Sequence, residues 1–176
     1  MLHMPAQDLS DSDTSLLGHT DGGSVTILFN VIGGLQLLPA GLSSTDENWQ
    51  YVKPEPGCAV VNLGDAMTQW TGGVLRSGLH RVQPAPGQQS VCPRYSVGYF
   101  LKPADNASMQ RLPGGVIPQL KPGEIDEDGD SNYPAWQRKK GAALKNGTYK
   151  LSNKGGAAFV RNFITEHHLG QTDLAA

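Results

Sequence analysis

The sequence predicts an all-β core of the jelly-roll type, a double-stranded β-helix in which two antiparallel sheets pack face to face. Seven or eight short apolar and β-branched runs recur at near-regular spacing through the first hundred residues, and Gly or Pro separates them. Because no ten-residue helical pattern lies between these runs, a parallel sheet of alternating strands and helices is disfavoured. A chain of 176 residues can bury the core of one domain.

The predicted strands follow one another along residues 1–103, which we assign to the core. The clearest is Val25–Phe29, whose β-branched and apolar side chains suit a buried strand. Gly33–Gly34 and Pro56–Gly57 have the composition of turns between strands. The other expected strands are Leu2–Met4, Leu35–Leu38, Trp49–Val52, Ala59–Leu63, His80–Val82 and Tyr95–Leu101.

Residues 104–176 differ in character, and we expect them to form a partly helical extension that covers the barrel. Pro113–Asp130 is rich in Pro, Gly and acidic residues, which predicts an exposed loop. A short basic helix is expected at Trp136–Leu144. The strongest helical periodicity lies in Gly156–His168, where Phe159, Phe163, Ile164 and His167 recur at helical spacing.

Three residues of the core have the side chains of a facial iron site. His19 and Asp21 are two apart, so they share one face if that stretch is extended, while Thr20 points the other way. His80 opens a different predicted strand, which would be an antiparallel neighbour. Two imidazoles and one carboxylate leave three positions of an octahedral metal open. His3 is a minor rival ligand; His167 and His168 are adjacent on a predicted helix and cannot face one site.

Arg94 and Ser96 form a second candidate pair, because both lie on one face of a predicted strand. The planar guanidinium matches a carboxylate, and the hydroxyl adds another donor. A keto acid chelated to the metal would need such a partner for its far carboxylate. The alternative is a surface arginine beside an ordinary strand serine.

Other features exclude several classes of function. The net charge of −2 disfavours nucleic-acid binding, and no apolar stretch is long enough to span a membrane. We expect no signal peptide, and Cys58 and Cys92 to be reduced thiols of a cytoplasmic protein. Asp126, Asp128 and Asp130 alternate like a calcium loop, but Ser131 and Gln137 stand where that loop needs Gly and Glu.

Over residues 1–103 the order of motifs resembles the 2-oxoglutarate/Fe(II)-dependent dioxygenases, the family that includes isopenicillin N synthase. The run His19–Leu28 is similar to the family's first metal strand. Val60–Asp65, Trp70–Gly73 and His80–Val82 resemble the segment that leads to its second histidine. Arg94–Ser96, followed by Tyr99 and Phe100, resembles its keto-acid strand.

This resemblance implies Fe(II) held by His19, Asp21 and His80, and 2-oxoglutarate held through its distal carboxylate by Arg94 and Ser96. It implies oxidative decarboxylation of 2-oxoglutarate, with O2, coupled to hydroxylation or desaturation of a small organic substrate. The chain departs from the family in having Met4 before Pro5, where a tyrosine is usual, and in lacking the N-terminal region. Two alternatives are an oxidase that uses no keto acid and a truncated, non-catalytic remnant.

Overall fold

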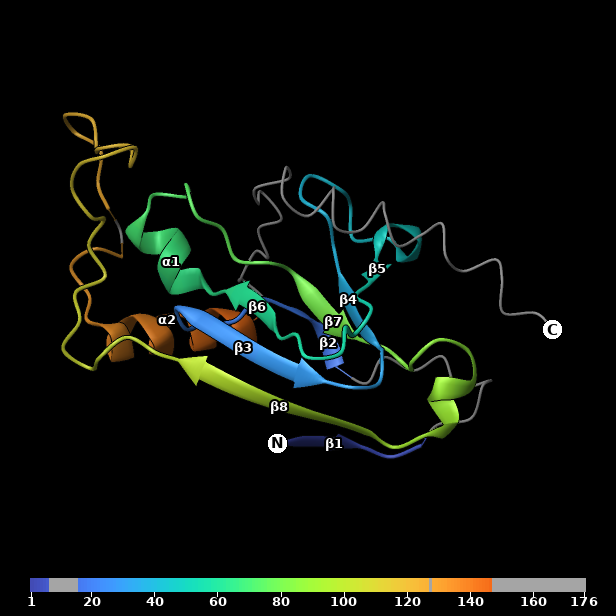
Figure 1. Ribbon diagram of the computed structural model, residues 1–176. Coiled ribbons are helices and arrows are strands. Elements are labelled where there is room, and N and C mark those ends of the chain that lie inside the picture. The colour runs from blue at the N-terminus through green and yellow to red at the C-terminus, as the bar shows by residue number, and fades with distance from the viewer. Residues whose placement is uncertain (7–15, 127, 147–176) are drawn as a thin grey trace.

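Two four-stranded antiparallel sheets face each other in the computed structural model, which describes residues 1–6, 16–126 and 128–146 (Figure 1). The first sheet has the order β1-β8-β3-β6 and the second the order β2-β7-β4-β5. This is the two-sheet arrangement that the spacing of short strands predicts. The first sheet consists of β1 (Leu2–Met4), β8 (Arg94–Leu101), β3 (Val25–Asn30) and β6 (Val60–Leu63); the second consists of β2 (Leu16–His19), β7 (His80–Val82), β4 (Leu35–Leu37) and β5 (Gln50–Tyr51).

The longest pairing in the molecule joins β3 to β8, with Val25 opposite Leu101 and Asn30 opposite Ser96. Paired residues share a face of the sheet, so the register separates two sets of side chains. Thr26, Arg94 and Ser96 are buried on the inner side. The outer side carries exposed apolar residues, namely Phe29, Val61, Tyr95, Val97 and Tyr99.

The turn between β3 and β4 depends on Gly34, which has a φ of 106°. A β-carbon at this position would lie 2.5 Å from the carbonyl oxygen of Gln83. Only glycine combines this left-handed backbone with such a close approach. The turn brings β4 beside β7, where Leu35 pairs with Val82 and Leu37 with His80.

Helix α1 (Asp65–Trp70) follows β6 directly, a helix that the sequence pattern did not predict. Gly64 is its N-cap, and the acidic Asp65 in its first turn suits the positive end of the helix dipole. The segment is only six residues long, so it shows little helical periodicity. Short 3-10 helices occupy Asp46–Asn48 and Gly87–Val91.

Helix α2 (Tyr133–Lys145) confirms the basic helix predicted at Trp136–Leu144 and begins three residues earlier. Its Pro134 lies in the first turn, where a missing backbone N–H costs nothing. Tyr133 and Trp136 pack with Met109 and with Ala66 of α1 in one buried cluster. The described part of the extension therefore covers the core as expected, whereas the helix predicted at Gly156–His168 lies outside the described residues.

A second apolar cluster lies on the other side of the molecule and consists of Leu38, Trp49 and Leu79. It secures the segment that leads into β7, because Leu38 N–H donates to the Leu79 carbonyl at 2.9 Å. This packing and hydrogen bond fix the start of β7 at His80.

Candidate metal centre

Strand pairing places His19 directly opposite His80. The two residues end β2 and begin β7, which are antiparallel neighbours. Asp21 lies two residues past the end of β2, so it is positioned by the following turn and not by the strand itself. One ligand atom from each of the three side chains lies within 4.8 Å of the others. The convergence expected from the sequence is present.

Both imidazoles present the same nitrogen to the centre. Nδ1 of His19 lies 2.8 Å from the Leu17 carbonyl oxygen, and Nδ1 of His80 lies 3.0 Å from that of Gly78. A carbonyl only accepts, so each Nδ1 carries a proton, and in the neutral imidazole the lone pair is then on Nε2, which faces the centre. Burial lowers the pKa of His80, which favours the neutral, metal-binding imidazole.

The Asp21 carboxylate is oriented by two donors from the first sheet. Its Oδ2 accepts hydrogen bonds from Thr26 Oγ1 at 2.7 Å and Asn62 Nδ2 at 3.0 Å. Its Oδ1 lies 3.9 Å from His19 Nε2 and 3.8 Å from His80 Nε2. One oxygen is therefore held, and the other faces both histidines. Thr26 and Asn62 were not predicted from the sequence, although each is a polar residue on the inner face of an apolar strand.

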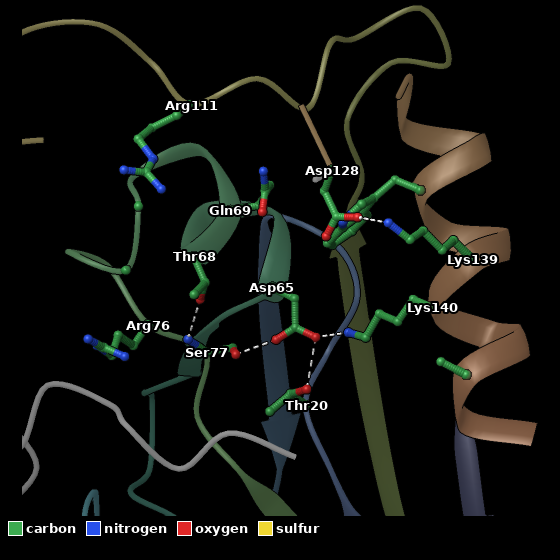
Figure 2. A pocket seen from close by; sticks show the side chains of 14 residues that line it. Thr20, Asp65, Thr68, Gln69, Arg76, Ser77, Arg111, Asp128, Lys139 and Lys140 are labelled. Carbon is green, nitrogen blue, oxygen red and sulfur yellow. Dashed lines mark hydrogen bonds and ion pairs between the residues drawn. The ribbon is translucent and has the colours of Figure 1, made fainter. Parts of the chain in front are cut away.

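A second carboxylate residue, Asp65, forms hydrogen bonds with the segments that carry the three ligands (Figure 2). It accepts from Thr20 Oγ1 at 2.9 Å and from the Ser77 hydroxyl, and its backbone N–H donates to the Asp21 carbonyl at 2.7 Å. Thr20 points away from the ligands, as its place between His19 and Asp21 predicts. Asp65 thus fixes the turn before β3 relative to the segment before His80.

Lys140 of α2 forms an ion pair with Asp65, and both side chains are buried. Burial lowers the pKa of Lys140 to about 8, and the negative charge of Asp21 opposes that shift. The ammonium balances a carboxylate that would otherwise be buried with its charge uncompensated. Sequence analysis did not find this contact, because the two residues are far apart along the chain.

Arg94 and Ser96 also lie together, as their shared strand face predicts. Arg94 Nη1 donates to Ser96 Oγ at 3.2 Å, and Arg94 Nε donates to the Gly33 carbonyl at 2.8 Å. Both residues are buried, yet Arg94 Nη2 has no hydrogen-bond partner. A buried guanidinium nitrogen without an acceptor is what the carboxylate of a bound acid would satisfy.

Strand β1 places Met4 beside this arginine, because Met4 pairs with Arg94 in the first sheet. Met4 Sδ lies 4.0 Å from Arg94 Nη1. A thioether is a weak acceptor and cannot donate a hydrogen bond to a carboxylate. The departure noted at Met4 therefore falls beside Arg94 itself, where a tyrosine hydroxyl would have supplied a further donor.

The rival ligands lie elsewhere. His3 stacks on Tyr95 at a ring-centroid distance of 4.7 Å. Asp128 pairs with Lys139 at 2.6 Å, and within the residues described the aspartates of that loop form no cluster able to hold a cation. His167 and His168 lie outside the described residues.

This donor set suits a divalent iron ion. Two neutral imidazoles and one carboxylate on one side of a metal are typical of non-haem Fe(II) sites, and the other three positions stay available. Comparison with known proteins agrees, since a family model for the 2OG-Fe(II) oxygenase superfamily matches residues 2–103. The chain belongs to this superfamily.

Several curated relatives of this oxygenase chain are fungal proteins. It is 38% identical over 117 residues to the 2-oxoglutarate-dependent dioxygenase iboH of Amanita muscaria, covering 66% of this chain and 55% of that protein. It is 37% identical over 116 residues to the 2-oxoglutarate-dependent dioxygenase gloE of Glarea lozoyensis, covering 66% and 33% of the two proteins. The chain thus spans about half, or less, of the length of these relatives.

Solved structures confirm the jelly-roll fold of the oxygenase core. A full-length Neurospora crassa protein, solved in complex with alpha-KG, matches with a TM-score of 0.63 and 29% identity, over 80% of this chain and 43% of that one. The rice dioxygenase for auxin oxidation matches with a TM-score of 0.58 and 25% identity, over 90% and 48%. In the part of the chain that the structure describes, no helix has the length and apolar character needed to cross a membrane.

Proposed function

We propose that this chain is an Fe(II)- and 2-oxoglutarate-dependent dioxygenase that hydroxylates or desaturates a small organic molecule. The observation that carries the proposal is the convergence of His19, Asp21 and His80 within 4.8 Å. The buried, unpartnered Nη2 of Arg94 supports it, because a keto acid needs a cation for its distal carboxylate.

His19, Asp21 and His80 would hold the iron, each oriented by a hydrogen bond on the side away from the metal. Arg94 and Ser96 would bind the distal carboxylate of 2-oxoglutarate and thereby set its position. When bound, iron and the keto acid supply the chemistry that activates O2 and oxidises a C–H bond. The residues of the protein would bind and orient the metal and the keto acid, and they would exclude water from the site.

The substrate class rests on the relatives. Structures of the Neurospora crassa protein have been solved with thymine or 5-formyluracil, both small molecules. A small organic substrate, such as a secondary metabolite, is the corresponding proposal for this chain. Action in the cytoplasm is supported by Cys58 and Cys92, which are free and exposed as expected for a reducing compartment.

Anaerobic titration of the protein with Fe(II) and then 2-oxoglutarate tests the proposal. We expect a weak visible charge-transfer band that saturates at one equivalent of iron, and succinate after O2 is admitted. Arg94→Leu should raise the 2-oxoglutarate concentration needed for the band about tenfold or more, because a charge-assisted pair is lost.

Each other outcome identifies a different failure. A bound iron without a band or succinate would favour an oxidase that uses no keto acid. A band that persists unchanged in Arg94→Leu would refute the role of Arg94. A melting temperature that Fe(II) does not raise would point to a remnant without a functional metal centre.

A further inference from the structure

A pocket of about 430 Å³ lies between α1 and α2 (Figure 2). It has the size of a small-molecule site. Thr20 and Asp65 contribute to its wall, but His19, Asp21 and His80 do not line it. Arg94 and Ser96 do not line it either, so the pocket is separate from both parts of the proposed oxygenase site.

Charge is distributed unevenly around this pocket. On one side Lys139 pairs with Asp128 at 2.6 Å, and Lys140 pairs with Asp65. On the opposite side lie the guanidinium groups of Arg76 and Arg111 (Figure 2). Among the described residues, neither arginine has an acidic side chain within ion-pair distance. These two guanidinium groups therefore have no ion-pair partner among those residues, and the Asp126 carboxylate accepts from the Arg111 backbone N–H at 3.2 Å and not from its side chain.

Two consecutive glycines of the pocket wall each lie against one of these arginines. Gly72 and Gly73 have φ values of 56° and 86°, and each supports one guanidinium. A β-carbon at Gly72 would lie 3.1 Å from Arg111 Cζ, and one at Gly73 would lie 3.5 Å from Arg76 Cζ. Because neither glycine has a side chain, both guanidinium groups can lie along this wall of the pocket. Two cations on one wall favour an anion in the pocket beside them.

Arg111 also has an unsatisfied donor. Its Nη1 donates to the Pro118 carbonyl at 3.0 Å, but its Nε is buried without a hydrogen-bond partner. Buried polar groups in native proteins almost always have partners. Nearby, Thr68 Oγ1 accepts from the Ser77 N–H at 3.0 Å, which leaves its own proton available to a ligand.

We propose that this pocket binds a small organic anion, whose carboxylate or phosphate groups lie against the wall that Arg76 and Arg111 form. Trp136 and Ala143 provide an apolar wall for the rest of such a molecule. The two lysine–aspartate pairs opposite are already balanced and would not compete for the anion. This site does not depend on iron or on the proposed oxygenase reaction.

Inorganic phosphate and malonate are suitable probes, titrated calorimetrically into protein freed of metal by chelation and dialysis. We expect saturable binding at one site for at least one of them. Arg76→Gln and Arg111→Gln should each weaken it about tenfold or more, since each removes a charge-assisted hydrogen bond. Arg138→Gln, at an exposed arginine of α2, should leave it unchanged.

An NMR titration of the unsubstituted protein gives a second readout that does not depend on any variant folding. The Nε–H resonance of Arg111 should shift with the same saturation curve. Binding of phosphate alone or malonate alone would identify the group that the site prefers. Absence of saturable binding of either probe would overturn the proposal. An affinity in Arg76→Gln and Arg111→Gln equal to that of the unsubstituted protein would overturn it as well.

Discussion

At the scale of single residues, the geometry of the metal centre is set by hydrogen bonds behind the ligands. Asp21 can turn one oxygen toward His19 and His80 because Thr26 and Asn62 hold the other. Outer partners of this kind fix ligand orientation and typically change metal affinity about ten- to a hundredfold. Thr26 and Asn62 are therefore positioning residues, which need not touch the metal or the substrate.

Thr26→Val tests this role with a side chain of nearly the same shape. We expect Fe(II) or Co(II) to bind about tenfold more weakly, because Asp21 loses one of its two orienting donors. Anaerobic calorimetry measures the affinity, and circular dichroism verifies the fold. Thr45→Val, at an exposed threonine, is the matched control. Equal metal affinity in Thr26→Val and the control would show that Thr26 does not position Asp21.

The sequence identified the candidate ligands but not their supports, for a physical reason. His19, Asp21 and His80 are side chains with a recognisable chemistry, and their order along the chain resembles a known family. Thr26 and Asn62 are ordinary strand residues until the register places Thr26 opposite Asn62 on the inner face of the sheet. The available signal was a polar residue at an inward-facing position of each otherwise apolar strand.

At the scale of secondary structure, α1 and α2 connect the extension to the metal centre. Asp65 begins α1 and binds Thr20, while Lys140 of α2 neutralises it. Tyr133 and Trp136 pack on Ala66 of α1 in the same region. A helix beyond the family match thus contacts the residue that holds the ligand segments in place.

Lys140→Met should therefore be damaging, whereas Lys139→Met should not. Breaking a buried ion pair costs about 3–5 kcal/mol of unfolding free energy, because Asp65 would keep an uncompensated charge. Lys139 is exposed and pairs with Asp128 at 2.6 Å, so its loss should cost about 1 kcal/mol or less. Urea unfolding measures both. Similar losses for the two variants would contradict the importance of the Lys140–Asp65 pair.

Elements were predictable where they are long or periodic. Val25–Phe29 and the basic helix of the extension were found because strand and helix patterns persist in them. Helix α1 was missed because six residues give less than two turns of periodicity. The strand Leu16–His19 has four residues without a clear alternation of apolar and polar side chains. An extended conformation was therefore expected there only because His19 and Asp21 need it to share one face.

At the scale of the whole molecule, the amino-acid composition changes at residue 103, but the packing is continuous across it. Met109, Tyr133 and Trp136 lie beyond it, yet they bury Ala66 of the core. We infer that residues 104–146 fold together with residues 1–103 as one cooperative unit.

A shortened chain tests this cooperativity. A chain ending at residue 103 should lose the cooperative transition that the full chain shows. It loses the buried cluster and the partner of Asp65 together. Differential scanning calorimetry compares the two chains. A cooperative, unshifted transition for the chain ending at residue 103 would show that the core is independent.

The most direct test of the metal centre is the stoichiometry of Fe(II) bound under anaerobic conditions to the protein and its variants. We predict one Fe(II) per chain, lost in His19→Ala, Asp21→Ala and His80→Ala. It should be retained in His3→Ala, whose ring stacks on Tyr95 and does not belong to the cluster. Iron that stays bound when Asp21 or His80 is replaced, or that is lost with His3, would contradict the convergence of these three side chains on one ion.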